Sequence, residues 1–328
     1  MTSASIKARF QRDGFVRIRN ILNFENDLKP VLNSMEFVMN RMVLRYVPRK
    51  LQSEIIGLPF KRKYQYLTKL SIPNVNQYFS IRYSQQNPTS NSDFLACKSI
   101  FNLIKNRKIH KCLEKILGSE IASNPVQNSR IKVPEKKLEF DNLHDGLLGR
   151  TPWHQDAAVL DKNGQKNTDL VTCWIPFTKT KIKNGCMLII KESHKLGLLN
   201  HGRGPKGQVE IKNKELLDKI ESIPLEADVG DIILMDKNTI HCSLPNVSKS
   251  FRISIDLRFN KAGQPTGREP LPSFYVTSKN KKNITVTNYM QWITLWEKAK
   301  EKCISRKYLY KLHVPTFRGK NRDLAQVI

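Results

Sequence analysis

The periodicity of hydrophobic and polar residues changes near Gly118, from a helical pattern before it to short strand-like runs after it. Apolar residues between 94 and 117 recur at the three- and four-residue spacing of a single helix, and Gly118 follows as a C-cap. Residues 24–70 show similar spacing, interrupted near prolines. We therefore expect helices to dominate the first third of the chain.

Short apolar runs separated by turn residues occupy the stretch after Gly118. Strand-like segments are predicted at 169–177, 185–193, 229–236 and 251–259. The second is entered through Asn184-Gly185, and we expect Gly185 to form a hairpin turn. Strands at this spacing, with Gly, Asn and Pro between them, predict an antiparallel sandwich or barrel.

The two ends of the chain add smaller elements. Residues 10–22 read as the end of a helix, a glycine turn and a short alternating strand. From residue 285 the pattern returns to a helix in which Trp292 and Trp296 share one face. We expect this face to pack against the barrel rather than to stack on nucleic-acid bases.

Length and composition limit the class of protein. The 328 residues suffice for one large domain or two ordinary ones. No apolar stretch approaches the roughly 18 residues of a membrane helix, and the first residues lack the apolar segment of a secretory signal. The six cysteines form no CxxC pair, which is typical of reduced thiols and argues against a disulfide framework or a zinc knuckle. We therefore expect a cytoplasmic protein without a membrane span.

A large excess of basic residues is the compositional anomaly. Lys and Arg number 56 against 29 Asp and Glu, a formal net charge of +27. Such a charge favours attraction to polyanions or to an acidic substrate. The lysines are nevertheless spread along the chain without a recognisable nucleic-acid module, which favours a solvated surface. We prefer the second interpretation and keep the first open.

The segment TPWHQDAAVL, residues 151–160, holds the first candidate for chemistry. His154 and Asp156 stand two residues apart, and in a strand such residues project from the same face toward one point. A non-haem iron centre needs two histidines and one carboxylate on one face of an octahedron. Among the other histidines, His241 follows an apolar strand and a short turn, where a ligand at a strand edge is expected. We therefore predict a metal site made of these three residues.

Strict alternation in the last predicted strand supports this choice. In FRISIDLRF, residues 251–259, the apolar side chains point one way and the polar ones the other. The polar face either meets solvent or lines the inside of a barrel. In the second case Arg252 and Ser254 present a guanidinium fork and a hydroxyl to an anion near the metal.

These stretches together resemble the phytanoyl-CoA dioxygenase family. The resemblance is carried by WHQD, NGCMLIIKESHKLG, GDIILMDKNTIHCSLPN and Arg252, which follows eleven residues after His241. The opening RDGFVRIRNIL is also similar, so the resemblance covers most of the chain. It implies a mainly β fold with flanking helices on a double-stranded β-helix (jelly-roll, cupin-like) core. We expect one domain over residues 1–328, with a helical or mixed part to about 118, the core at about 119–280 and a helical tail at about 285–328.

The resemblance also implies a role for each matching residue. The implied iron ligands are His154, Asp156 and His241. Arg252 is implied to pair with the distal carboxylate of 2-oxoglutarate. Further cosubstrate contacts are implied at Ser243, Ser254, Trp174 and Asn128. For Trp174 and Asn128, a core indole and a turn amide are equally good interpretations.

The family consists of iron(II)- and 2-oxoglutarate-dependent oxygenases. The implied reaction is hydroxylation of an unactivated C–H bond, in which 2-oxoglutarate and O₂ yield succinate and CO₂. Fe²⁺, 2-oxoglutarate and O₂ are therefore expected, with ascorbate as an additional reductant. The carboxylate at Asp156 favours hydroxylation, desaturation or ring chemistry over halogenation, since halogenases of the superfamily carry a small residue there.

The substrate is left open by the sequence. Family members act on acyl-CoA thioesters, amino acids, osmolytes and secondary metabolites. The segments expected to cover the site, 60–93, 136–150 and 198–228, are rich in cations, which suit a small anionic metabolite and equally a solvated lid. The charge of +27 keeps two alternatives open: an oxygenase acting on nucleic acid or protein, and a non-catalytic jelly-roll that binds a polyanion. The oligomeric state is not readable from these patterns.

Overall fold

The fold is a sandwich of two antiparallel sheets with helices packed on the outside of the larger sheet. The computed structural model describes residues 3–70, 75–83, 94–134, 151–204 and 208–305. The larger sheet has the order β1-β8-β3-β10-β2-β11 and the smaller one the order β7-β4-β9. The strands are β1 (Phe15–Ile18), β2 (Ile121–Lys132), β3 (Val171–Pro176), β4 (Met187–Ile189), β5 (His201–Arg203), β6 (Val209–Ile211), β7 (Ile223–Leu225), β8 (Ile232–Asp236), β9 (His241–Ser243), β10 (Arg252–Lys261) and β11 (Phe274–Thr277).

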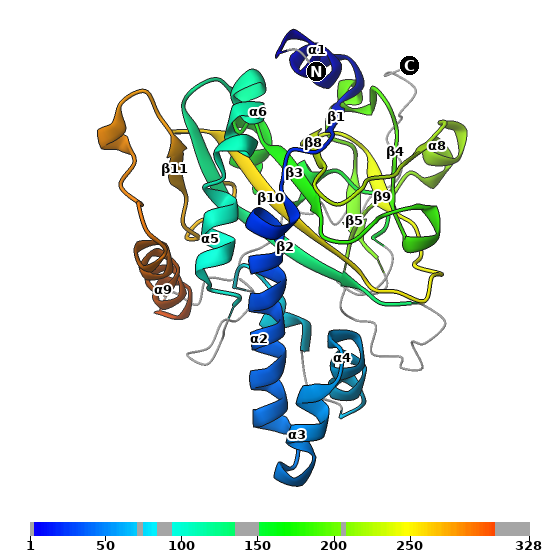
Figure 1. Ribbon diagram of the computed structural model, residues 1–328. Coiled ribbons are helices and arrows are strands. Elements are labelled where there is room, and N and C mark those ends of the chain that lie inside the picture. Colours follow the sequence, from blue (N-terminus) through cyan, green and yellow to red (C-terminus); the bar gives the residue numbers. More distant parts are fainter. Residues whose placement is uncertain (1–2, 71–74, 84–93, 135–150, 205–207, 306–328) are drawn as a thin grey trace.

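Most helices of the described residues belong to the first third of the chain. In Figure 1, helix α2 (Lys29–Tyr46) extends away from the larger sheet, and helices α3 and α4 lie beside the end of α2 that is remote from the sheet. The helices are α1 (Ser3–Asp13), α2 (Lys29–Tyr46), α3 (Arg49–Gly57), α4 (Phe60–Lys69), α5 (Lys98–Ile104), α6 (Arg107–Leu117), α7 (Lys162–Asn167), α8 (Lys214–Lys219) and α9 (Tyr289–Ser305). Within the described ranges, no helix combines the length and the apolar character that crossing a membrane requires.

The central strands are buried on both faces, which explains their hydrophobic patterns. In β8, Ile232 and Leu234 join a core shared with α2, α5, α6 and α9, while Ile233 and Met235 join a second cluster between the two sheets. A strand covered on both sides reads as a continuous apolar run. The run VGDIILMD therefore belongs to a strand in the middle of the molecule.

Strand β10 has the same two burial partners but different chemistry on its two faces. Ile253, Ile255 and Leu257 pack into the core beneath the helices. Arg252, Asp256 and Arg258 are also buried, at 2–4% exposure, and line a cavity between the sheets. The polar face of this strand thus lines the inside of the sandwich, which is the second of the two placements that the sequence left open.

The helical expectations are confirmed in outline and wrong at one boundary. Residues 94–117 were expected to form one helix, but α5 and α6 are separate. Asn106 separates them because its side chain accepts a hydrogen bond from the Lys108 backbone N–H, capping α6. Gly118 follows α6 with φ +86°, as a C-cap requires.

The expected hairpin at Gly185 is wrong. The preceding strand β3 belongs to the larger sheet and the following strand β4 to the smaller one. Gly185 instead ends a short 3₁₀ turn with φ +79°, and a Cβ there would lie 2.6 Å from the Leu244 carbonyl oxygen. Gly185 therefore lies where the chain passes from the larger sheet to the smaller one, and the absence of a side chain lets its backbone approach that of Leu244.

The tryptophans of α9 are packing residues, as expected, but their partners belong to the first third of the chain. Trp292 and Trp296 are each 1% exposed. Their rings lie 5.7 and 5.4 Å from the ring of Phe94, and Trp292 also contacts Phe101 of α5. Helix α9 therefore fastens the end of the described chain to the helical part.

Candidate metal centre

A backbone bridge brings the two candidate histidines together. The N–H of His154 donates to the carbonyl of His241, and the N–H of His241 donates back to the carbonyl of His154, both at 3.0 Å. The two imidazole rings consequently lie with their centroids 4.2 Å apart. Asp156 begins a 3₁₀ turn directly after this bridge, with its Oδ1 3.8 Å from Nε2 of His154. One ligand atom from each residue lies within 4.8 Å of the others.

Hydrogen bonds orient both imidazoles toward this common point. Nδ1 of His154 is 2.9 Å from the Pro152 carbonyl, and Nδ1 of His241 is 2.9 Å from the Thr239 carbonyl. A carbonyl only accepts, so each Nδ1 carries the proton and each Nε2 presents its lone pair. Burial, and next the neighbouring His241, hold the pKa of His154 well below its ordinary value. His154 is therefore neutral, the form that binds a metal.

The carboxylate of Asp156 is ionised although it is buried. Burial raises the pKa of this group, but electrostatic attraction, above all to the Arg258 guanidinium, outweighs burial and brings the pKa well below its ordinary range. Two imidazole nitrogens and one carboxylate oxygen are the donor set of the two-histidine, one-carboxylate iron sites, which leave three positions open. The chemistry of the donors therefore fits a divalent iron ion.

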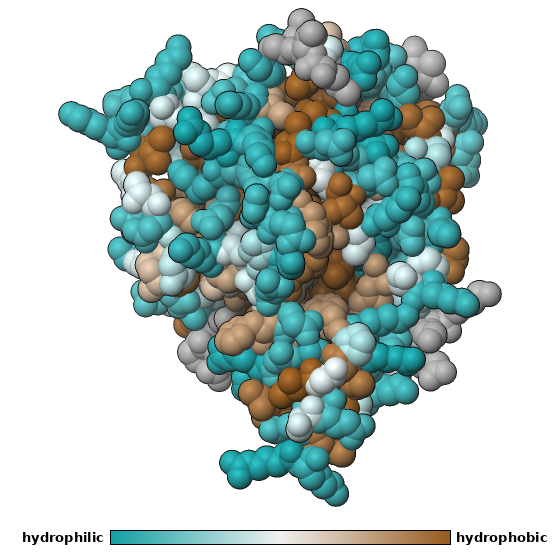
Figure 2. Space-filling model, viewed as in Figure 1, coloured by the Kyte–Doolittle hydropathy of each residue, from teal (hydrophilic) through white to brown (hydrophobic). Residues whose placement is uncertain are grey.

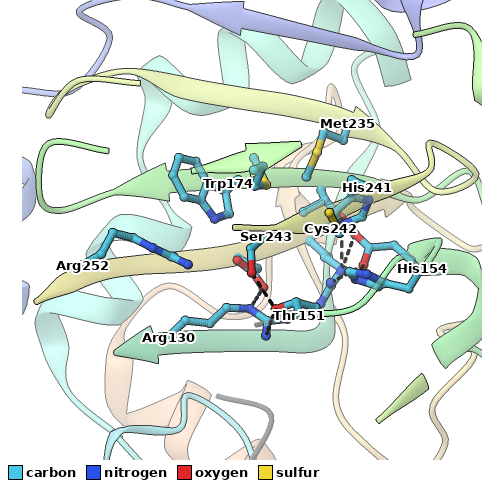
Figure 3. Close-up of a pocket in the computed structure, with 14 residues that line it drawn as sticks. Arg130, Thr151, His154, Trp174, Met235, His241, Cys242, Ser243 and Arg252 are labelled. Carbon is cyan, nitrogen blue, oxygen red and sulfur yellow. Dashed lines mark hydrogen bonds and ion pairs between the residues drawn. The ribbon is translucent and has the colours of Figure 1, made fainter. Parts of the chain in front are cut away.

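The same cavity holds a buried cation, Arg252, which forms no ion pair with a carboxylate among the described residues (Figure 3). Within the part of the chain that the structure describes, the Arg252 guanidinium donates through Nη1 to Ser254 Oγ and lies 5.8 Å from the centroid of the Trp174 ring. Its Nε is buried and has no hydrogen-bond partner among the residues that the structure describes. Burial, and then repulsion from Arg130, lower the pKa of Arg252 to about 10. Such a group is prepared to receive an anion.

The other residues implied as cosubstrate contacts take different positions. Trp174 and Ser243 line the cavity, and Ser254 stands behind Arg252. Ser243 Oγ accepts hydrogen bonds from Lys132 Nζ and from the Thr151 backbone N–H, both at 2.9 Å. Asn128 accepts from Arg82 at 3.2 Å and is not among the residues that line the cavity. Of the five residues implied as cosubstrate contacts, Arg252 included, the structure thus places all but Asn128 around or behind the cavity.

Several residues of the site escaped the sequence analysis. Arg130 lines the cavity and forms an ion pair with Asp256 at 2.9 Å, and Thr172 and Arg258 contact Asp156. The alternation in residues 251–259 placed Arg258 on the polar face of the predicted strand, and this pattern could have indicated that Arg258 belongs to the site. Arg130 stands in a segment without a distinctive pattern, and Thr172 stands in a predicted strand that gave no sign of its contact with Asp156.

Comparisons with known proteins show the family to which the chain is similar. A family model described as phytanoyl-CoA dioxygenase (PhyH) matches residues 10–254. The chain is 29% identical over 119 residues to a phytanoyl-CoA dioxygenase domain-containing protein 1 homolog of Dictyostelium discoideum, covering 34% of this chain and 41% of that protein. It is 28% identical over 113 residues to a phytanoyl-CoA dioxygenase of Arabidopsis thaliana, covering 34% and 39%. These alignments span only about two-fifths of the relatives' own length.

Solved structures share the fold at low sequence identity. The non-heme monooxygenase ThoJ in its apo form matches with a TM-score of 0.55 and 17% identity, covering 92% of this chain and 98% of that one. The epimerase SnoN in complex with Fe³⁺, alpha ketoglutarate and nogalamycin RO matches with a TM-score of 0.51 and 16% identity, covering 81% and 87%. The expected mainly β jelly-roll fold with flanking helices is confirmed.

Proposed function

Because the chain belongs to the phytanoyl-CoA dioxygenase family, we propose that it is an iron(II)- and 2-oxoglutarate-dependent oxygenase that hydroxylates a C–H bond of a small metabolite. The observation that carries the proposal is the meeting, in one cavity, of three metal donors and a buried arginine that has no carboxylate partner in the described part of the chain. His154 and His241 would hold the metal through Nε2, and Asp156 through Oδ1. Iron, when bound there, supplies the activation of O₂.

The protein's own contribution is to bind and orient the cosubstrate. Arg252 would receive the distal carboxylate of 2-oxoglutarate on its planar fork, with Ser254 fixing the guanidinium from behind. Trp174 covers one side of that guanidinium, so the ion pair would form away from water. Low dielectric strengthens such a pair, so binding of 2-oxoglutarate would offset the cost of burying Arg252 that the ligand-free protein bears.

A small, anionic metabolite suits the charge of the cavity. Besides Arg252, the lining includes Arg130 and Arg258, which form ion pairs with Asp256 and Asp156. The face of the molecule in Figure 2 is largely hydrophilic, so the excess of lysine and arginine also has ample solvent contact. We therefore assign to the overall charge no role in recognising nucleic acid.

The proposal is tested by an anaerobic titration of the protein with Fe²⁺ and 2-oxoglutarate. Formation of the complex is followed by the visible metal-to-ligand charge-transfer band. We expect the band to require both components, to vanish in His154→Ala and to weaken in Arg252→Ala. A His110→Gln variant is the matched control, since His110 is equally buried but bonds to the Ile104 carbonyl beneath the sheet. Absence of the band in the wild-type protein would overturn the proposal and favour a non-catalytic jelly-roll.

The rate of succinate release then identifies the class of compound that serves as substrate. The wild-type protein would be supplied with Fe²⁺, 2-oxoglutarate, O₂ and ascorbate, and panels of carboxylates, phosphates and acyl-CoA esters would be compared with neutral analogues. Stimulation by anionic compounds alone would support the substrate class. Release stimulated only by oligonucleotides or peptides would transfer the proposal to a macromolecular substrate.

A further inference from the structure

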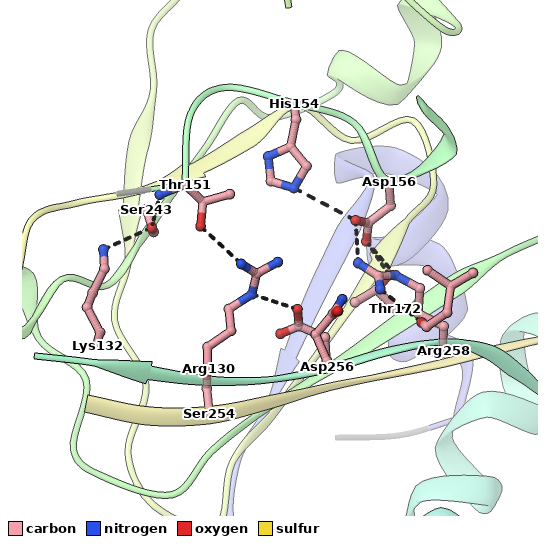
Figure 4. A network of polar contacts seen from close by, with 12 residues as sticks. Arg130, Lys132, Thr151, His154, Asp156, Thr172, Ser243, Ser254, Asp256 and Arg258 are labelled. Carbon is pink, nitrogen blue, oxygen red and sulfur yellow. Dashed lines mark hydrogen bonds and ion pairs between the residues drawn. The ribbon is translucent and has the colours of Figure 1, made fainter. Parts of the chain in front are cut away.

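Two residues on the sheet hold the carboxylate of Asp156 from behind (Figure 4). Arg258 donates to both carboxylate oxygens, from Nη2 to Oδ1 at 2.6 Å and from Nε to Oδ2 at 3.2 Å. Thr172 donates its hydroxyl proton to Oδ2 and itself accepts from Nε of Arg258 at 3.0 Å. The three side chains form a closed triangle that is almost completely buried.

The two oxygens of Asp156 are left in different states by these contacts. Oδ2 accepts from two donors and lies on the side of Thr172 and Arg258. Oδ1 accepts from one donor and is the oxygen that faces Nε2 of His154, at 3.8 Å. Only Oδ1 therefore combines a remaining lone pair with the direction of the metal site.

The sheet itself fixes Arg258. Arg258 and Thr172 are cross-strand partners in the pairing of β10 with β3. On the other side, the register of β10 with β2 shifts between Asp256 and Arg258, which leaves Val126 outside the ladder. The carbonyl of Val126 then accepts from Nη1 of Arg258 at 2.9 Å. With Nε, Nη1 and Nη2 all engaged, the guanidinium is held at fixed points on two neighbouring strands.

We propose that Arg258, assisted by Thr172, is a positioning residue that presents Asp156 to the metal through a single oxygen. The proposal rests on the proposed function. A carboxylate that bound through both oxygens would take a further position of an octahedron, whereas 2-oxoglutarate and O₂ together need three. Arg258 and Thr172 would thus leave three coordination positions for 2-oxoglutarate and O₂. They would also fix the orientation of the Asp156 carboxylate beside the two histidines.

The test compares Co²⁺ and 2-oxoglutarate binding in the wild-type protein and in Arg258→Gln, Arg258→Lys and Thr172→Val. Co²⁺ affinity is measured by titration of its visible d–d bands, and 2-oxoglutarate affinity by the change that it causes in those bands. We expect Arg258→Gln to lower Co²⁺ affinity about 10- to 100-fold, the range typical for partners of metal ligands. Arg258→Lys keeps the charge but not the fork, so we expect it to restore folding stability without restoring affinity.

A second readout separates positioning from a general loss of structure. On Co²⁺-saturated protein, both Arg258→Lys and Thr172→Val should bind 2-oxoglutarate more weakly than the wild type, although Arg252 is unchanged. Arg17→Gln is the matched control, because it removes another arginine–aspartate pair of the same sheet, with Asp231, outside the cavity. Its affinities for both ligands should equal those of the wild type.

Each result decides one question. Failure of the wild-type protein to bind Co²⁺ would count against the proposed function itself. Wild-type binding that is matched by folded Arg258→Lys and Thr172→Val variants, for both ligands, would overturn the role of Arg258. Should Arg258→Gln not fold, the two milder variants still decide, since Thr172→Val keeps the shape of the side chain and removes only its hydrogen bonds.

Discussion

Replacing Arg252 with methionine is expected to maintain or increase the stability of the ligand-free protein, which is unusual for the loss of a buried charge. The pKa of Arg252 is lowered from 12.5 to about 10, which corresponds to a penalty on the charged form of about 3 kcal/mol. Arg252→Met removes this penalty and keeps most of the apolar stem. It also removes the hydrogen bond to Ser254, worth roughly 1.5–3 kcal/mol for a charged donor.

The two effects nearly offset, so we expect the free energy of unfolding to change by about 0 to +2 kcal/mol. Truncating one partner of a buried ion pair typically costs about 3–5 kcal/mol instead. Urea denaturation of the metal-free protein, followed by far-ultraviolet circular dichroism, measures the difference. Ser254→Ala serves as the control that removes the hydrogen bond alone.

Ligand binding should reverse the order of the two proteins. With Co²⁺ present and 2-oxoglutarate at a hundred times its Kd, the wild type should gain about 2.7 kcal/mol, whereas Arg252→Met should gain nothing at the same concentration. A ligand-free variant destabilised by more than about 2 kcal/mol would refute the account of Arg252 as an uncompensated cation. Equal stabilisation of both proteins by 2-oxoglutarate would refute its role in binding.

Three further predictions concern parts of the fold away from the cavity. Burial lowers the pKa of His110 to about 4, so the unfolded chain binds a proton at a higher pH than the folded protein does. The free energy of unfolding therefore falls as the pH drops from about 6.5 toward 4. In urea titrations at pH 7 and pH 5, the wild type should lose about 2 kcal/mol more than His110→Gln. Gly230→Ala should cost about 1–3 kcal/mol in the same assay, because φ is +94° and the new Cβ would lie 2.7 Å from the Leu22 carbonyl oxygen; an unchanged midpoint would contradict this. Ile255→Ala should cost about 2–5 kcal/mol but leave Co²⁺ affinity intact, since its fully buried side chain lies on the face of β10 opposite the cavity; a parallel loss of affinity would show that the faces are not independent.

Local patterns predicted the elements of this fold better than their connections. The alternation in β10 indicated a two-faced strand, and both faces are present. Strand β2 was missed because Pro125 and many polar residues made its segment resemble a loop. Its polar side chains are buried by the polar interior of the sandwich, a property of the assembled sheets that no local window contains. The crossing at Gly185 was misread for the same reason, since a turn residue does not reveal which sheet the next strand joins.

The candidate site divides along similar lines. His154 and Asp156 were proposed from their spacing, and His241 from its place after an apolar strand. The structure brings their donor atoms together, while their role as ligands stays a prediction until metal binding is measured. Arg258 and Thr172 are 102 and 16 residues from Asp156 in sequence, and the pairing of β10 with β3 places them side by side where both contact it.

Strand β10 also has a consequence for how the chain reaches its native pairing. A strand alternates faces with each residue, so a slip of one residue against β3 or β2 would exchange its two sides. Arg252, Asp256 and Arg258 would then enter the apolar core under the helices, and isoleucines would enter the polar cavity. Buried unpaired charges are among the most expensive errors in a protein. Arg252 and Arg258, which we assign to cosubstrate binding and to positioning Asp156, therefore also disfavour the misregistered sheet. Variants that make this face apolar should fold with more alternative pairings.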